Sequence, residues 1–573
     1  MCDQDSIAST LTDAEKEGRL IDALVSVELN AEGTVVEDVL SQLHNDGRID
    51  LASDVNLAAI HALDQRHFWD VFHPLYKSIS TLRCEYREIL GLVNALVTKA
   101  GNDGAAGMPN IALVSWSQNN STEAEKIVDG IRQGDKLCLE HGLFAIIGLG
   151  DERVCLDLMQ SSNHSEKILG LRALGRLETI EVDTIKKGVD ASYAIIDQET
   201  DEHLRLAAIE AAFRFWEKLG HSQPFRQIEI IERVGRQRNV RELTALSGAL
   251  FYHKAGLPRE TINAVLDLLA ATPSNSDATL QNLDHAITND DERWEFEKIA
   301  SVFAYCITTL ENQADERSYH GFRAMVWSDP ANASYLFSEW LSSGQFGPCS
   351  FLSQLAASSD KDVQVSILKR HLPEDGDVQK FMVRKSIGFL WHHEVTAALV
   401  LLSVVKNGKA AARTLAEDLL FNPLLLSYGG KLRDYLETQR NSKSKRVADC
   451  VSRILAKHDE HLAGIECVED LIELRPSIDQ RRAAAVKDQE RRREIEKGAH
   501  ERSILSSLVT HETLLYGRKS LSIIQGGDGA KYPSVTELSE FSFSMEVPRL
   551  SVFDPVGFSE RLTVLRAMKR KSE

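Results

Sequence analysis

The sequence predicts an all-α protein whose middle is a stack of helix pairs, with a small β-containing module at the C-terminal end. Three observations predict this fold class. Apolar residues recur at helical spacing through most of the 573 residues, and only 13 prolines are spread among them. One helical pattern also repeats within residues 126–260. At roughly 100–200 residues per domain, this length allows several domains or one repeat array with appendages.

The first hundred residues, 1–100, predict an N-terminal unit of helices of uneven length. Apolar positions recur every three or four residues in the segments 20–29, 35–44 and 55–64. A glycine-bearing stretch with one proline follows at 101–110. Because glycine and proline interrupt helices, we expect a linker and a short helix over 101–125.

The repeats over 126–260 are the most informative part of the chain. Three segments begin with a polar residue and continue as an apolar helix rich in small residues. They start at Asp135, His164 and Asp201. A shift of 28 residues places Gly142 on Gly170, and a further shift of 37 places Gly170 on Ala207. A weaker fourth copy occupies 239–253, and second helices lie between the copies.

The small residues of these copies explain how the helices stack. Glycine and alanine let a neighbouring helix approach closely, and larger residues beside them fill the groove between layers. A helix–turn–helix unit of this length cannot bury its own apolar face, so it must stack on its neighbours. A compact helical bundle remains an alternative.

The third copy carries a resemblance to a known class of repeat. Its start resembles that of HEAT repeats, which build α-solenoids. The matching residues are Asp201, Leu204, Arg205, Ala208 and Ala211. The resemblance implies an irregular HEAT-like solenoid with an extended surface for a protein partner.

Residues 261–475 predict further helical repeats. The candidate helices include 362–372 and the apolar run of 11 residues from Val395 to Val405. A membrane-spanning helix needs about 20 apolar residues, so this run predicts a buried core helix.

The character of the chain changes near its end. Residues 476–514 predict a highly charged helix, and 515–573 predict a small α+β module. Within the module, KSLSII at 519–524, a GGDG turn at 526–529 and the alternating FSFSMEV at 541–547 are typical of a β element. A short helix is expected after it.

Composition and the N-terminal sequence indicate the cellular location of the protein and the classes of ligand that it is not expected to bind. The net charge of −19 disfavours non-specific nucleic-acid binding, which depends on Lys and Arg. Eight cysteines occur without any C-x-x-C spacing, so neither a zinc ribbon nor a redox motif is expected. The N-terminus MCDQDSIAST lacks the features of a signal peptide. We therefore expect a cytoplasmic protein with reduced thiols and no cofactor.

No catalytic motif is present. The chain lacks the P-loop, H-E-x-x-H and G-x-S-x-G patterns. The segment 427–431 (SYGGK) predicts a turn rather than a phosphate cradle. His458 and His461 lie three residues apart beside two acids, and they predict an exposed helix end rather than a metal site. We expect no catalytic, metal or cofactor-binding residue, and hence no enzyme.

A basic stretch in the charged helix is the best candidate contact surface. Between Arg481 and Arg502 there are eight Lys or Arg against five acidic residues. No aromatic residue lies among them, so base stacking is not expected. A solvated helix with interleaved charges is the competing interpretation. The candidate contacts are Arg481, Arg482, Lys487, Arg491, Arg492, Arg493 and Lys497.

The sequence therefore predicts a non-catalytic scaffold or adaptor, a complex subunit that binds a protein partner through its solenoid surface. Two alternatives stay open. One is a nucleic-acid-associated subunit of a DNA-processing or defence complex that uses the basic helix 481–502. The other is an enzyme with a site at the C-terminal module. Neither a membrane nor a small-molecule substrate is indicated.

Overall fold

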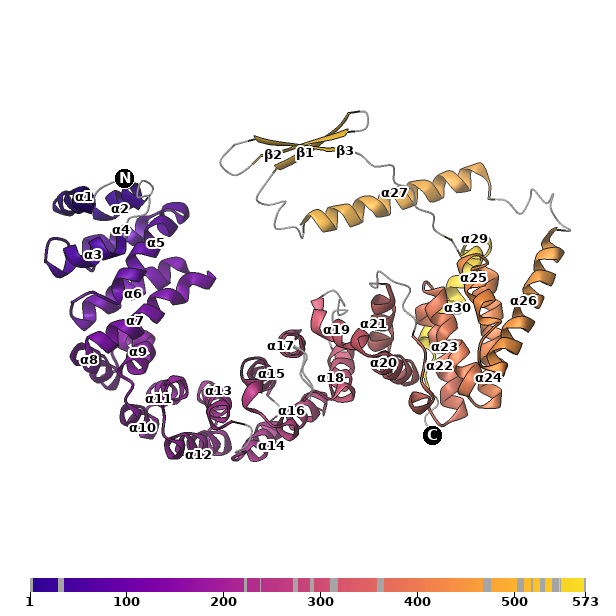
Figure 1. Ribbon diagram of the computed structural model, residues 1–573, viewed down its shortest axis with the longest axis horizontal. Helices are drawn as coiled ribbons and strands as arrows, with labels where there is room; N and C mark the ends of the chain where they lie inside the picture. Colours follow the sequence, from indigo (N-terminus) through magenta and orange to yellow (C-terminus); the bar gives the residue numbers. More distant parts are fainter. Residues whose placement is uncertain are drawn as a thin grey trace. The chain divides into compact units, whose positions relative to one another are not determined.

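The computed structural model confirms an all-α protein with a small β element near its C-terminal end (Figure 1). The residues that it describes are 4–28, 36–220, 224–237, 239–271, 277–288, 293–309, 318–357, 365–466, 476–501, 510–516, 519–525, 531–537, 546 and 548–570. The chain divides into two compact units, Met1–Asn332 and Ala333–Glu573, and each is described by itself. Among the described residues, none of the helices is both long and apolar enough to cross a membrane.

Unit 1 consists of helices. Their bounds are α1 Gln4–Lys16, α2 Leu20–Glu28, α3 Val36–Asn45, α4 Asp54–Ala62, α5 Gln65–Ile79, α6 Tyr86–Ala100, η1 Gly104–Gly107, α7 Met108–Asn119, α8 Ser121–Arg132, α9 Lys136–Leu149, α10 Glu152–Gln160, α11 His164–Arg176, α12 Val182–Gln198, α13 Glu202–Leu219, α14 Gln227–Gln237, α15 Val240–His253, η2 Lys254–Gly256, α16 Arg259–Ala271, α17 Asp277–Ile287, α18 Phe296–Thr309 and α19 His320–Ser328.

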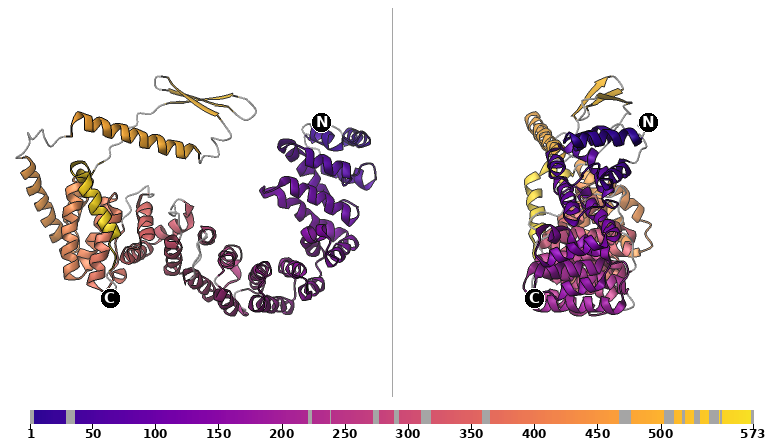
Figure 2. Two further views of the ribbon diagram at one scale, coloured as in Figure 1. Left: turned by 180° about the vertical axis from the view of Figure 1, so that it is seen from behind. Right: turned by 90° about the vertical axis from the view of Figure 1, so that its left-hand side faces the viewer.

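These helices form two layers. Helices α7, α9, α11, α13, α15, α17 and α19 pack on one another in sequence, and α10, α12, α14, α16 and α18 form the second layer. The unit curves so that α11, α13, α15 and α17 lie on its inner side (Figures 1 and 2). A helix pair that stacks only on its neighbours is the arrangement of a solenoid. The stacked-helix interpretation of the sequence is therefore confirmed, and the compact bundle is wrong for this unit.

A polar residue at or just before the start of each copy is the N-cap of its helix. Asp135 accepts a hydrogen bond from the backbone N–H of Cys138 at 3.2 Å, and Asp201 accepts one from Leu204 at 2.8 Å. Asn163 and Asn239 cap α11 and α15 in the same way. Each side chain satisfies a backbone N–H that has no partner within the helix. The repeat pattern thus marks where each inner helix starts.

Small residues lie where helices approach most closely, as the sequence predicts. A Cβ atom on Gly170 of α11 would lie 2.7 Å from the carbonyl oxygen of Cys155 on α10. A Cβ atom on Gly142 of α9 would lie 2.6 Å from Cδ1 of Ile131 on α8. Ala208 on α13 is fully buried. Larger side chains at these positions would push the two layers apart.

The arginine of the repeat start forms a buried ion pair. Arg205 on α13 and Glu242 on α15 are each only 1% exposed, and two guanidinium N–H groups donate to the two carboxylate oxygens at 2.6 and 2.9 Å. Arg205 also donates to the carbonyl oxygen of Ile196 at the end of α12. This one side chain therefore links three helices of the stack, α12, α13 and α15.

The segment 101–125, which was expected to hold a linker, does not separate two parts of the fold. Helices α7 and α8 occupy most of it, and only η1 separates α6 from α7. Trp116 of α7 is fully buried and donates a hydrogen bond to the carbonyl oxygen of Leu82 at 3.0 Å. Because the glycines fall in the short turn between two packed helices, they interrupt a helix without dividing the fold.

Unit 2 continues the helical architecture after α20, which crosses the division at Pro330–Ser343. Its further elements are α21 Phe346–Ala357, η4 Lys369–His371, α22 Gly376–Leu390, α23 Glu394–Asn407, α24 Ala410–Leu419, η5 Leu420–Leu425, α25 Lys431–Gln439, α26 Lys445–Glu466, α27 Ile478–Glu501, β1 Thr510–Tyr516, β2 Lys519–Gln525, β3 Lys531–Glu537, α29 Arg549–Phe553 and α30 Pro555–Ala567. The apolar run Val395–Val405 is buried within α23, as predicted.

One predicted helix of this unit is wrong. Of the segment 362–372, residues 362–364 lie outside the described residues, and 365–368 are non-helical. The backbone N–H of Ile367 donates to the hydroxyl of Ser403 at 2.9 Å, and that of Leu368 donates to Ser334 at 2.7 Å. Side chains of neighbouring helices therefore replace the hydrogen bonds that a helix would have made.

The end of the chain packs on α22. Lys385 of α22 is buried and donates to the carbonyl oxygen of Arg566 in α30 at 2.6 Å, and Arg566 donates to the carbonyl oxygen of Gly388 at 2.6 Å. The ring of Phe558 lies 4.8 Å from that of Trp391. The last helix is thus part of the helical core of unit 2, whereas the sequence placed it in a separate module at 515–573.

The β element is a three-stranded antiparallel sheet in the order β1–β2–β3. Strand β2 confirms the predicted strand at KSLSII. It pairs with both neighbours: with β1, whose residues 510–514 lie where the charged helix was predicted to continue, and with β3, where Leu521 lies opposite Val535. The predicted GGDG turn, 526–529, lies outside the described residues, as does nearly all of the predicted strand 541–547.

A groove lined by arginines on the inner layer

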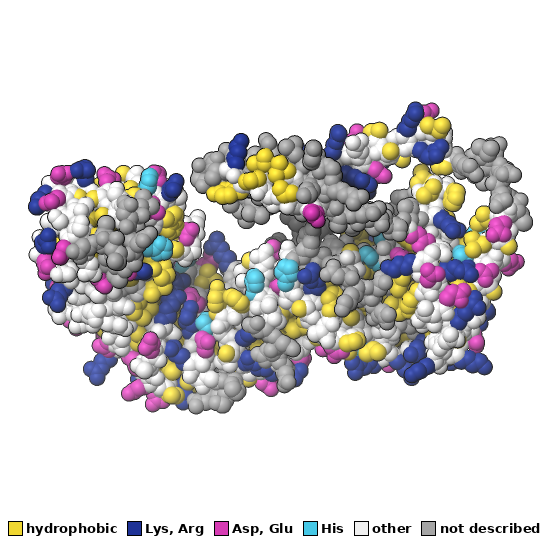
Figure 3. All heavy atoms as spheres, turned by 45° about the horizontal axis from the view of Figure 1, so that its top comes forward, with side chains coloured by type: hydrophobic (Ala, Val, Ile, Leu, Met, Phe, Trp, Pro, Cys, Tyr) yellow, Lys and Arg dark blue, Asp and Glu magenta, His cyan; other side chains and the backbone are white. Residues whose placement is uncertain are grey.

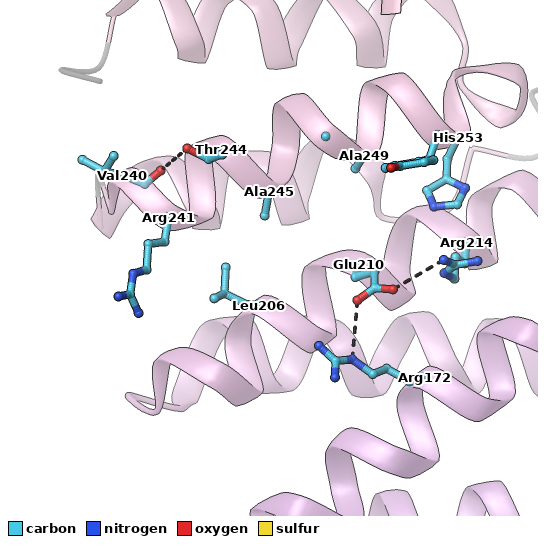
Figure 4. A pocket seen from close by; sticks show the side chains of 12 residues that line it. Arg172, Leu206, Glu210, Arg214, Val240, Arg241, Thr244, Ala245, Ala249 and His253 are labelled. Atoms are coloured by element: carbon cyan, nitrogen blue, oxygen red, sulfur yellow. Dashed lines mark hydrogen bonds and ion pairs between the residues drawn. The ribbon is translucent and has the colours of Figure 1, made fainter. Parts of the chain in front are cut away.

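A groove of about 590 Å³ lies on the inner layer of unit 1, between α11, α13 and α15 (Figure 4). Its lining is mostly apolar and includes three arginines. The lining residues are Arg172, Leu206, Glu210, Arg214, Val240, Arg241, Thr244, Ala245, Gly248, Ala249, Tyr252 and His253. The stacking of three consecutive copies therefore creates a concave surface of the size that proteins use for ligands.

A single carboxylate on the groove wall serves three arginines. Glu210 lies 3.0 Å from Arg176 and 3.5 Å from Arg172, both on α11, and 3.5 Å from Arg214 on its own helix. Figure 4 shows Glu210 reaching toward Arg172 and Arg214 across the base of the groove. One negative charge cannot balance three positive charges, so the wall carries a local excess of positive charge.

The hydrogen-bond donors of this cluster are also in excess. The buried Nη1 atom of Arg176 and the buried Nε atom of Arg214 have no hydrogen-bond partner among the described residues. Burial lowers the pKa of the Arg176 guanidinium. The charge of Glu210 opposes that shift, and the smaller effects of Arg214 and Arg172 add to it. A buried donor without a partner is unfavourable, so the guanidinium groups of this cluster are not fully satisfied by Glu210 alone.

The rest of the groove is apolar and has an aromatic rim. Tyr252 is 71% exposed, and its ring packs edge-on against Phe251 at 4.7 Å. Phe251 in turn lies 5.7 Å from the ring of His285 on α17. Figure 3 shows hydrophobic, histidine and basic side chains gathered on the inner side of this unit. Exposed aromatic rings beside arginines are characteristic of protein interfaces.

His253 closes one end of the groove. It is 5% exposed, and its Nδ1 lies 2.7 Å from the carboxylate of Glu217. Burial lowers the pKa of His253, although the contact with Glu217 opposes that shift. The imidazole is therefore predominantly neutral near pH 7, and the positive charge of the groove comes from the arginines.

The basic residues singled out in the sequence lie on α27. Side chains 478–495 of this helix are all exposed, and so is Lys497. The candidate contacts Arg481, Arg482, Lys487, Arg491, Arg492, Arg493 and Lys497 therefore lie around the whole helix, and Arg502 lies outside the described residues.

The two weaker candidates have internal partners. The backbone N–H groups of Gly430 and Lys431, in the SYGGK turn, donate to the carboxylate of Glu546 at 2.7 and 3.0 Å. His458 is buried, and its Nδ1 lies 2.9 Å from Arg433. Burial and the charge of Arg433 lower the pKa of His458. Among the described residues, no three His, Cys, Asp or Glu side chains are grouped as metal ligands would be.

The groove arginines were not singled out by the sequence analysis. The available signal was their spacing, because Arg172 and Arg176 lie four residues apart and so do Glu210 and Arg214. Residues four apart share one face of a helix, which here is the face that the stack leaves open. The sequence could not show that Glu210 would be the shared partner of both arginines on α11.

Comparisons with known proteins add no family. No protein-family model matches the chain, and no curated protein matches it. A search of solved structures finds the crystal structure of an engineered protein from the Northeast Structural Genomics Consortium. It has 15% sequence identity and a TM-score of 0.23, over 80% of this chain and 98% of that one. A TM-score this low carries no conclusion about function.

Proposed function

We propose that this chain is a non-catalytic scaffold that docks a protein partner in the groove between α11, α13 and α15. The observation that carries the proposal is the open, partly apolar groove with an aromatic rim on the inner layer. Solenoids present extended concave surfaces of this kind to partners. The absence of catalytic motifs from the sequence agrees with a binding role.

Two finer assignments belong to the same proposal. The Asp201 cap, the interlayer Arg205 and the buried Ala208 support membership of the repeats in a HEAT-like class. A cytoplasmic location is supported by the cysteines of the described part of the chain, none of which forms a disulfide bond. These cysteines are Cys84, Cys138, Cys155, Cys306, Cys349 and Cys450.

The alternative functions stay predictions. Helix α27 offers basic residues for nucleic acid, but acids alternate with them on the same exposed surface. A solvated single helix held by pairs of opposite charge accounts for the same pattern. The other alternative is an enzyme with a site at the C-terminal module. Among the described residues of that module, we find no cluster of side chains that supports it.

Filling the groove tests the docking proposal. Ala245 points from α15 into the groove in Figure 4, so Ala245→Trp should occupy it without disturbing the interlayer packing. We expect the full chain carrying this change to lose its partner when it is purified from its native cells. The reduction should be about tenfold or more, with an unchanged melting temperature.

The matched control is Lys187→Trp, at an exposed position on α12 of the outer layer. This change adds the same side chain to the other face of the stack, so the partner should be retained. Recovery of the same partner in equal yield from wild type and from Ala245→Trp would contradict the proposal.

A further inference from the structure

The charge of the groove specifies what its partner carries. We infer that the groove binds an acidic peptide segment, in which an Asp or Glu side chain lies close to an apolar one. This inference rests on the proposed docking function and adds the chemistry of the docked segment. It follows from three features: surplus guanidinium donors, an apolar floor and an exposed tyrosine.

The surplus donors select a carboxylate. Arg172 and Arg214 both line the groove, and both share Glu210 with Arg176. A second carboxylate placed beside Glu210 would accept hydrogen bonds from the accessible guanidinium groups of Arg172 and Arg214, whose side chains are 40% and 28% exposed. Guanidinium–carboxylate hydrogen bonds are short, charge-assisted and often paired, so they fix the orientation of the bound group. A carboxylate on the partner would thus reduce the excess of three arginines over the single carboxylate of Glu210.

The floor selects an apolar neighbour for that carboxylate. Leu206 of α13 faces Ala245 and Ala249 of α15, and small side chains leave the space between them open. An aliphatic or aromatic side chain would fill it and release the water that covers this surface. Tyr252 stands at the rim, where its ring could cover the segment and its hydroxyl could bond to the peptide backbone.

A peptide fits these features better than a nucleic acid. A phosphodiester chain needs a run of basic contacts along its backbone, whereas this groove is mostly apolar with one basic wall. The net charge of −19 also repels a long polyanion, while a short acidic segment brings only local charge. Local attraction in a partly buried site is screened less by salt than attraction at a surface.

The inference is tested by selection from a random peptide library displayed on phage, with the full chain as bait. Ala245→Trp serves as the counter-selection protein, so that only groove binders are enriched. We expect the enriched peptides to share an Asp or Glu close to an apolar residue. A fluorescein-labelled enriched peptide should then bind the full chain about tenfold or more tightly than its Asn or Gln counterpart.

Two kinds of variant give opposite results if the inference holds. Arg172→Gln and Arg214→Gln should each weaken binding of the acidic peptide by about tenfold or more. Glu210→Gln should tighten it, because the competing carboxylate is removed while a hydrogen-bond acceptor remains. A purely structural role for Glu210 would give weaker binding instead. Arg214→Lys keeps the charge and serves as a second variant if Arg214→Gln lowers the melting temperature. It should bind the acidic peptide with an affinity between those of wild type and Arg214→Gln.

The outcomes separate this inference from the docking proposal. The enriched peptides could lack acidic residues and still bind wild type but not Ala245→Trp. That result would overturn the inference and would agree with the docking proposal. Selection of phosphorylated or nucleic-acid ligands by the same arginines in place of the acidic peptide would also overturn it. If no peptide distinguishes wild type from Ala245→Trp, both statements fail for this groove.

Discussion

Replacing Arg205 by methionine should lower the free energy of unfolding of the stack by about 3–5 kcal/mol, the largest effect that we expect from a single change. Methionine removes both hydrogen bonds to Glu242 and leaves that carboxylate buried at 1% exposure without its counter-ion. It also frees the carbonyl oxygen of Ile196. Denaturant unfolding followed by circular dichroism measures the loss.

Two further variants identify the cause of this loss. The double variant Arg205→Met/Glu242→Leu replaces the pair by apolar groups and should recover much of the stability, because no uncompensated charge stays buried. Arg241→Met is the control, because Arg241 is next to Glu242 on α15 but forms an exposed ion pair with Glu202. It should change stability by less than about 1 kcal/mol. Equal losses for Arg205→Met and Arg241→Met would mean that the buried pair does not hold the stack together.

The second large effect is expected from Ala208→Phe on α13. Ala208 is fully buried, and Ala211, one turn further along, is 1% exposed. A phenylalanine ring at Ala208 would overpack the interlayer space, destabilise the unit by about 1–3 kcal/mol or more, and broaden the thermal transition. Differential scanning calorimetry measures both changes.

The same substitution at an exposed helical alanine is the control. Ala278 lies in the first turn of α17 and faces solvent. Ala278→Phe should leave the transition almost unchanged, since it alters no interlayer contact. A wild-type melting curve for Ala208→Phe would show that this face of α13 does not pack against a neighbouring helix.

The part of the fold that repeats could be predicted from sequence, because repetition converts long-range packing into a local pattern. Caps such as Asp135 and Asp201 and small residues such as Gly170 recur at the same point of each copy. Their positions in the structure match those expectations. Residues 365–368 were missed because their hydrogen bonds go to Ser334 and Ser403, which no local pattern reveals.

Contacts between distant segments lay beyond the reach of a single sequence. Lys385 and Arg566 are 181 residues apart, so nothing near either one indicates that α30 packs on α22. The groove was missed for a related reason. Arg172, Glu210 and Arg214 are ordinary surface residues in sequence, and only the stacking of α11 on α13 makes them one cluster.

Photo-crosslinking from the groove tests the central claim most directly. Benzoylphenylalanine would replace Tyr252 at the groove rim, or Lys187 on the outer layer, in the full chain within its native cells. We predict that light joins one discrete protein to the chain from position 252 and not from position 187, and that added acidic peptide from the selection suppresses this product. Crosslinks of equal yield and identity from both positions, or none from position 252, would contradict the claim that the inner groove is the docking surface.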